Sequence, residues 1–170
     1  MSFRFASHDP HTYRRTSRLV GLAMAGQLIV FGLVFTQLLG TAFTPSLWLN
    51  GLGVLLGLVA TSLVLAVLRD RPWLGPVRYG WRLKQRLSTV SGYLPALRRG
   101  MADGDERALA VLAFYHQGMA QLGELDGRTL DDDAELLAER QALRLARQAR
   151  RLPERVDGLD EADLADFKRG

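Results

Sequence analysis

The chain has 170 residues, a formal net charge of +4, a hydrophobic content of 48% and no cysteine. The lack of cysteine excludes disulfide frameworks, thiolate metal sites and cysteine nucleophiles. Charge alternates along the second half of the chain: residues 69–100 and 136–155 are basic, whereas residues 101–135 and 156–170 are acidic. This alternation indicates charge pairing within a folded domain, and it gives little support to nucleic-acid binding.

Residues 1–18 are predicted to form a cytoplasmic N-terminal arm. Within this arm, Asp9 followed by Pro10 has the pattern of a helix N-cap with proline at the first helical position. The first helix is therefore expected to begin ahead of the apolar region that follows.

Two apolar segments, residues 19–39 and 47–68, contain no charged residue and are joined by a short linker. Each has about 20 residues, which at about 1.5 Å per residue is enough to cross a hydrocarbon core roughly 30 Å thick. Because the linker is short, the two helices must be antiparallel, and we predict a transmembrane hairpin over residues 19–68. A cleaved signal peptide is the alternative for the first segment, but its apolar core would extend over only about 7 to 15 residues.

The distribution of arginine predicts the orientation of the hairpin. Lys and Arg near the ends of a span resist translocation, so positive flanks mark the cytoplasmic side. The N-terminal flank and the segment after the second span are rich in arginine, whereas the linker carries no charge. Both termini are therefore predicted to be cytoplasmic.

Small residues recur at helical spacing in both spans. They are Gly53, Gly57 and Thr61 in the second span and Gly21, Ala25, Gly32 and Thr36 in the first. Lipid tails are as apolar as leucine, so helices in a bilayer associate through the close backbone approach that small residues permit. The stripes are interpreted as packing the hairpin on itself. The alternative is that one stripe also binds a second copy of the chain or another membrane protein.

Polar residues in the spans are few and none of the main ones is ionisable: Gln27, Gln37 and Asn50. Transport paths usually show ionisable groups inside the bilayer, so two such spans make a poor pore unless several copies assemble. These residues are expected to form interhelical hydrogen bonds. A subunit of an oligomeric channel or transporter remains the alternative function.

Residues 69–170 are predicted to form a cytoplasmic helical domain of about four helices. In its first helix, over residues 76–97, leucines recur at helical spacing while Arg78, Arg82 and Arg86 step along a neighbouring face. This amphipathic helix either contacts anionic lipid head groups, at about 1 kcal/mol per basic side chain, or packs its leucines into the domain, and packing is favoured. Pro95 is expected to kink or end it.

The remaining helices are predicted from their start signals and apolar patterns. Asp105 is the expected N-cap of a helix over residues 106–122, which is apolar around most of its circumference and so is placed at the centre of the domain. The acids Asp131–Asp133 are interpreted as the start of a helix reaching about residue 152 rather than as a cation site. A short last helix over residues 160–167 is expected to dock through Leu164 and Phe167. The predicted fold class is all-α.

Catalytic motifs are absent from the sequence, including zinc-protease, phosphate-loop, nucleophile-elbow and dinucleotide patterns. Of the three histidines, His8 and His11 lie on the solvated arm, and His116 is interpreted as a structural histidine with its hydrogen bonds satisfied. We therefore predict no enzyme, no cofactor and no metal site, and the sequence identifies no small-molecule substrate. A membrane-tethered enzyme remains a third possibility.

Four stretches together resemble a known family. They read L-N-G-L-G-V-L-L-G-L over residues 49–58, W-R-L-K-Q over 81–85, G-D-E-R-A-L-A-V-L-A-F-Y-H-Q over 104–117 and L-D-G-R-T-L over 125–130. The resemblance is to short two-span membrane proteins of unknown function from gammaproteobacteria. It implies an inner-membrane protein with a cytoplasmic helical tail, and it supplies no activity or ligand. Pro95 and the arginine-rich residues 140–155 depart from the family pattern.

The function predicted from the sequence is that of a membrane-anchored interaction or scaffold protein in the bacterial inner membrane. Its expected partners are the lipid bilayer with its anionic head groups, and itself or another membrane protein.

Overall fold

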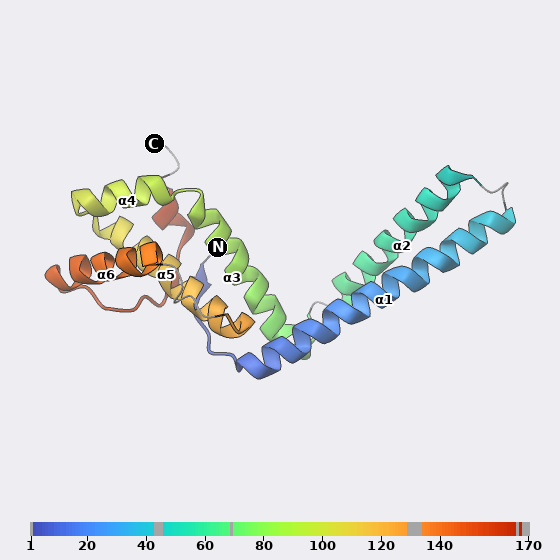
Figure 1. The fold of residues 1–170 in the computed structure, drawn as a ribbon, viewed down its shortest axis with the longest axis horizontal. Helices are drawn as coiled ribbons and strands as arrows, with labels where there is room; N and C mark the ends of the chain where they lie inside the picture. The colour runs from blue at the N-terminus through green and yellow to red at the C-terminus, as the bar shows by residue number, and fades with distance from the viewer. Residues whose placement is uncertain (1, 43–45, 69, 129–133, 166, 168–170) are drawn as a thin grey trace. The chain divides into compact units, whose positions relative to one another are not determined.

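The computed structural model describes residues 2–42, 46–68, 70–128, 134–165 and 167, and it is mainly helical (Figure 1). The helices are α1 (Pro10–Ala42), α2 (Leu47–Leu68), α3 (Gly75–Ser91), α4 (Leu94–Asp103), α5 (Glu106–Asp126) and α6 (Ala134–Ala149). The shorter elements are the 3-10 helices Pro72–Leu74 and Glu161–Leu164 and the strands β1 (Phe3–Arg4) and β2 (Gly158–Leu159). The predicted helical class is confirmed, and the small pair of strands is the departure from it. The acids Asp131–Asp133, interpreted above as the start of a helix, lie outside the described residues.

The chain divides into two compact units. The hairpin unit is Thr12–Arg78, and the helical unit is Met1–His11 together with Tyr79–Gly170. This grouping differs from the predicted segments 1–18, 19–68 and 69–170, because the first residues of the arm belong to the helical unit while its last residues continue into the hairpin.

The hairpin unit is built from α1 and α2, which contain the predicted spans 19–39 and 47–68. The N-terminal start of α1 follows the sequence signal, since Asp9 Oδ1 accepts a hydrogen bond from the His11 N–H at 3.4 Å. Both helices are long and apolar enough to cross a membrane, and only 6% and 17% of their apolar windows are buried within the chain. The core helix of a soluble domain would be mostly buried.

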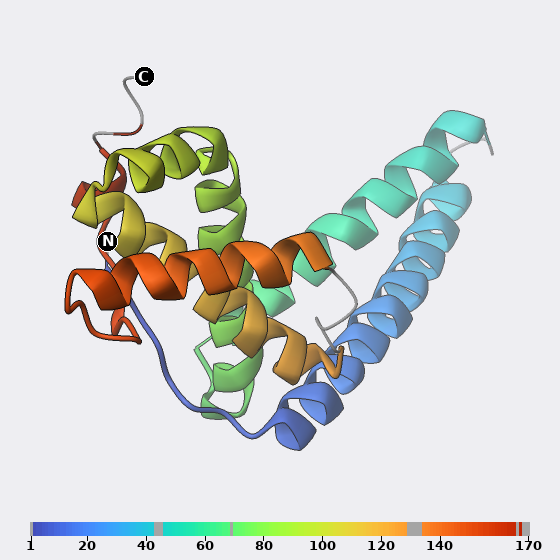
Figure 2. The same cartoon turned by 60° about the vertical axis from the view of Figure 1, so that its left-hand side comes forward.

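The helical unit is organised around α5, as its all-round apolar pattern predicts. Asp105 caps the helix by accepting a hydrogen bond from the Arg107 N–H at 2.9 Å, and Gly127 ends it with a left-handed φ of 72°. Its buried residues include Leu109, Leu112 and Phe114, which are fully buried. Figure 2 shows α6 lying across α5.

The amphipathic helix packs into this core, which is the favoured alternative. Leu83, Leu87 and Val90 of α3 are buried there. The helix ends at Ser91 rather than bending at Pro95, because Pro95 occupies the first turn of the new helix α4, a position where its missing N–H costs no hydrogen bond.

The N-terminal segment packs against the helical unit, contrary to the expected solvated arm. Phe3 pairs with Leu159 in the antiparallel contact of β1 with β2, and its side chain is 6% exposed. The Tyr79 hydroxyl accepts a hydrogen bond from the Ala6 N–H at 3.2 Å and donates one to Gln121 Oε1 at 2.6 Å. Hydrogen bonds and aromatic contacts therefore hold the N-terminal segment against the helical unit, although the sequence predicts a solvated arm.

Candidate functional site

The helix-packing residues of α2 lie at the contact within the hairpin. Gly53, Gly57 and Thr61 are its buried residues. A Cβ atom added to Gly57 would lie 2.9 Å from the Gly32 backbone nitrogen, and one added to Gly53 would lie 2.9 Å from that of Thr36. The glycines are therefore required because the two backbones approach too closely for any side chain.

Two of the predicted packing residues of α1, Gly21 and Ala25, are exposed and lie off this contact. A Cβ atom added to Gly21 would have nothing within 4 Å. Val20 of α1 is buried in a small cluster with Leu74 and Val77. The packing role of Gly21 and Ala25 stays a prediction.

The Thr61 hydroxyl bonds within its own helix rather than across the hairpin. Its Oγ1 donates to the Gly57 carbonyl oxygen at 2.9 Å. Of the amide side chains, Gln37 and Asn50 are exposed and Gln27 is half-buried. No hydrogen bond between α1 and α2 involves these three amides in the described part of the chain.

The three arginines assigned to lipid head groups occupy different surroundings. Arg78 Nη1 pairs with Asp70 Oδ1 at 2.9 Å, Arg82 is exposed and Arg86 is half-buried. Arg82 is thus the most available of the three for a phosphate group.

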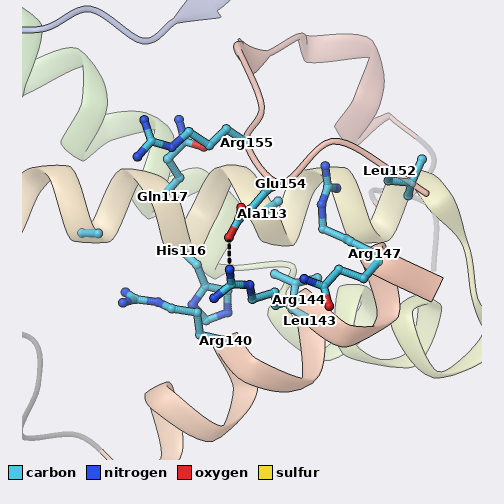
Figure 3. Close-up of a pocket in the computed structure, with 12 residues that line it drawn as sticks. Ala113, His116, Gln117, Arg140, Leu143, Arg144, Arg147, Leu152, Glu154 and Arg155 are labelled. Carbon is cyan, nitrogen blue, oxygen red and sulfur yellow. Dashed lines mark ion pairs between the residues drawn. The ribbon is translucent and has the colours of Figure 1, made fainter. Parts of the chain in front are cut away.

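A pocket of about 330 Å³ lies in the helical unit between α5, α6 and the segment that follows α6 (Figure 3). Its lining residues are Ala113, His116, Gln117, Ala120, Arg140, Leu143, Arg144, Arg147, Gln148, Leu152, Glu154 and Arg155. Four of these side chains are arginines and one is an acid. The pocket therefore combines a strong positive charge with apolar walls.

His116 lies on the pocket wall and is 3% exposed. Neither ring nitrogen has a hydrogen-bond partner among the described residues, so the expected satisfied histidine is wrong. Burial lowers the pKa of His116, the Glu139 carboxylate 3.7 Å from Nε2 opposes this, and Arg140 and Arg98 lower the pKa further. The ring is therefore neutral near pH 7.

Glu139 is held in place by Arg98 of α4. Arg98 Nε donates to Oε1 at 2.8 Å and Nη2 donates to Oε2 at 3.0 Å. These hydrogen bonds are the main reason that the pKa of Glu139 is lowered. The carboxylate beside His116 is thus already neutralised by a bidentate partner.

The arginines of the pocket differ in what they bind. Arg147 is 5% exposed and donates to the carbonyl oxygens of Leu109 and Pro153 at 3.0 and 2.6 Å, so it is a structural link. Arg144 pairs with Glu154 at 2.7 Å on the exposed rim. Arg140 has a buried Nη2 without a hydrogen-bond partner among the described residues. Arg140 and His116 are thus the two groups with unused hydrogen-bonding capacity.

Sequence reasoning missed this pocket, although a signal was present. Arg140, Arg144 and Arg147 are spaced i, i+4, i+7 and so share a face of α6 with the buried Leu143. Arginines on the core-facing side of a helix are unusual, because a buried guanidinium needs partners. The predicted absence of metal ligands is untested, and no cluster of potential ligands is found in the part of the chain that was searched.

The fold and the pocket define a helical protein with two apolar helices of membrane-spanning length and a separate helical unit that contains a basic pocket. The chain belongs to the family described as "Protein of unknown function (DUF3087)", whose model matches residues 3–161. This confirms the resemblance to a family of unknown function. No curated protein and no solved structure matches the chain.

Proposed function

We propose that this protein is an integral membrane protein whose hairpin anchors a helical binding unit, and that it acts by binding rather than by catalysis. The observation that carries the proposal is the exposure of large apolar side chains along both helices of the hairpin. Leu22 of α1 is 73% exposed and Leu47 and Trp48 of α2 are 89% and 88% exposed. A continuous apolar surface of this kind is unfavourable in water and suits a lipid environment.

The arginine-rich flanks favour an orientation with both termini in the cytoplasm, since the linker between α1 and α2 carries no charge. The bacterial inner membrane is the proposed location. The hairpin packs on itself through Gly53 and Gly57, so the outward surfaces, which include Gly21 and Ala25, are free to contact lipid, a second copy or another membrane protein.

Arg82 carries the proposed contact with anionic head groups. A Lys or Arg near an anionic membrane surface contributes about 1 kcal/mol of attraction. Replacing Arg82 by Glu is expected to lower the amount of anionic lipid that co-purifies with the full chain, as measured by lipid mass spectrometry. Arg99→Glu on α4 is the matched control, and equal loss in both variants contradicts a specific contact of Arg82.

The binding role is tested by cross-linking in native membranes, followed by affinity purification and mass spectrometry of the tagged full chain. We expect one other protein to recur in stoichiometric amount. Recovery of neither a partner nor a self-linked species would contradict the binding role.

A second candidate function is that of a subunit in an oligomeric channel or transporter. The exposure of Gln37 and Asn50 on apolar helices favours it, because several copies could bring these amides to a shared polar path. The size of the purified complex separates the two candidates. A monomer or dimer cannot enclose a path between hairpins, whereas a larger ring would favour the channel.

A further inference from the structure

The basic pocket of the helical unit has a wall with buried donors that lack partners among the described residues, and a positive charge that its single acid balances only in part. Its lining contains four arginines and a single acid, Glu154, which already pairs with Arg144. A net positive charge in a partly enclosed, low-dielectric site attracts anions strongly.

The inner part of the wall is formed by Arg140 and His116, which Figure 3 shows next to one another. Arg140 Nη2 and both ring nitrogens of His116 are buried and without hydrogen-bond partners among the described residues. Buried polar groups that lack a partner are costly, and a ligand that accepts hydrogen bonds from Arg140 and from the single N–H of the neutral His116 ring recovers part of that cost. The carboxylate nearest to His116, on Glu139, is already bound by Arg98, so it does not supply the missing partner for Arg140.

The other walls and the volume restrict the kind of ligand. Ala113, Leu143 and Leu152 provide apolar contacts, and about 330 Å³ lies near the lower limit of small-molecule sites, roughly 300 to 1,000 Å³. The guanidinium group presents a planar pair of donors that matches two oxygens of a phosphate. A small molecule with a phosphate group and an apolar or neutral remainder fits both features.

We propose that the pocket between α5 and α6 binds the phosphate group of a small molecule, with Arg140 as the principal donor. The phosphate group comes either from a soluble phosphate ester or from the head group of a lipid. This inference names the class of ligand that the helical unit binds, and it rests on the proposed binding role. Its test is independent of the cross-linked partner, so one can fail while the other stands.

The test titrates the full chain in nanodiscs of neutral lipid with inorganic phosphate and with glycerol 3-phosphate at constant ionic strength, and follows ³¹P resonances of both probes. Constant salt is needed because screening changes every ionic contact. We expect saturable binding, weakened about tenfold or more by Arg140→Gln and unchanged by Arg99→Gln, which removes an exposed arginine that does not line the pocket.

A second variant keeps the proposal testable if Arg140→Gln reduces folding. Ala120→Leu adds a side chain at the exposed rim of the pocket without changing its charge. This variant is expected to weaken the binding of glycerol 3-phosphate more than the binding of inorganic phosphate, because the larger probe needs more of the pocket volume. Equal binding by wild type, Arg140→Gln and Ala120→Leu, or no saturable binding by the wild type, overturns the proposal.

Nanodiscs that contain phosphatidylglycerol separate the two sources of phosphate. If a lipid head group occupies the pocket, these discs abolish binding of the soluble probes in the wild type. If the ligand is soluble, binding is the same in both kinds of disc. Either result supports the phosphate site, and it shows whether the phosphate group belongs to a lipid or to a soluble molecule.

Discussion

At the scale of single residues, the most informative side chain is a histidine that carries no charge. His116 is almost completely buried, and its ring lies beside Glu139, whose charge is already shared with Arg98. Burial therefore dominates over attraction, and the pKa of the imidazole falls below its ordinary value of 6.5. The folded unit therefore favours the neutral form of the ring.

This predicts a loss of stability on acidification. Because the pKa of His116 is lower in the folded state, the unfolded chain takes up a proton first, and the free energy of unfolding decreases as the pH falls below about 6.5. In His116→Leu the decrease between pH 7.5 and 5.5 is expected to be smaller. Thermal unfolding of the full chain in detergent at several pH values measures this.

The control for this experiment is His11→Gln, since His11 is exposed. An equally steep pH dependence in wild type and His116→Leu would contradict the account. Glu139 does not interfere in this range, because its pKa is also lowered and its stabilising contribution is lost only below about pH 4.5.

At the scale of elements, the hairpin contact is asymmetric. A Cβ on Gly57 would lie 2.9 and 3.1 Å from backbone atoms of Gly32, whereas a Cβ on Gly32 would have nothing within 4 Å. The side of Gly57 that would carry a Cβ faces the partner backbone, while the corresponding side of Gly32 faces away.

Gly57→Ala is therefore expected to weaken the association of α1 with α2 by about 1 to 3 kcal/mol, the usual cost of forcing a methyl group into a filled contact. Gly32→Ala and Gly51→Ala are expected to have little effect, since both positions have open space. Denaturation of the three variants in mixed detergent micelles makes the comparison. Equal destabilisation by Gly57→Ala and Gly32→Ala would show that the contact is arranged differently.

The contact of β1 with β2 is a second element that can be tested. Phe3 packs edge-to-face on Phe114 with ring centroids 5.7 Å apart and is part of the main core. Phe3→Ala is expected to destabilise the helical unit by about 3 to 5 kcal/mol, because it leaves a cavity. Arg4→Ala, on the exposed face of the same strand, is the control. Thermal unfolding that is unchanged in Phe3→Ala would contradict the packing of the N-terminal segment.

The elements that sequence reasoning predicted well are those specified by local signals. Asp9 with Pro10 and Asp105 mark helix starts, and apolar spacing places α5 at the centre, although α5 continues to Asp126, beyond the predicted end at residue 122. Local signals do not predict β1 and β2. Strands of two residues are too short to show an alternation of apolar and polar residues, and they pair residues far apart in the chain. Of the stripe predicted on α1, Gly32 and Thr36 lie at the contact with α2, whereas Gly21 and Ala25 are exposed.

The pocket could not be predicted for a related reason. Arg140 and Arg155 lie on separate elements, α6 and the segment after it, and they line one pocket with His116 only because α6 packs on α5. The sequence shows a basic stretch, and a solvated helix face is the usual interpretation of such a stretch. Only the tertiary arrangement distinguishes a pocket from a charged surface.

At the scale of the whole molecule, we propose that a membrane hairpin anchors a helical unit on the cytoplasmic side. The family match extends over residues 3–161 and so includes both strands, both apolar helices and every arginine of the pocket. We propose that the two units act together, the first holding the second at the membrane where its ligand or partner is met.

The labelling of single cysteines tests this central claim most directly, because the natural chain has none. Ser46→Cys, Leu55→Cys and Ala142→Cys are all exposed positions, and each is treated with a membrane-impermeant maleimide in intact and in lysed cells. The account predicts that Ser46→Cys reacts in intact cells, that Ala142→Cys reacts only after lysis, and that Leu55→Cys resists in both. Reaction of Leu55→Cys in lysed cells without detergent, or of Ala142→Cys in intact cells, would contradict it.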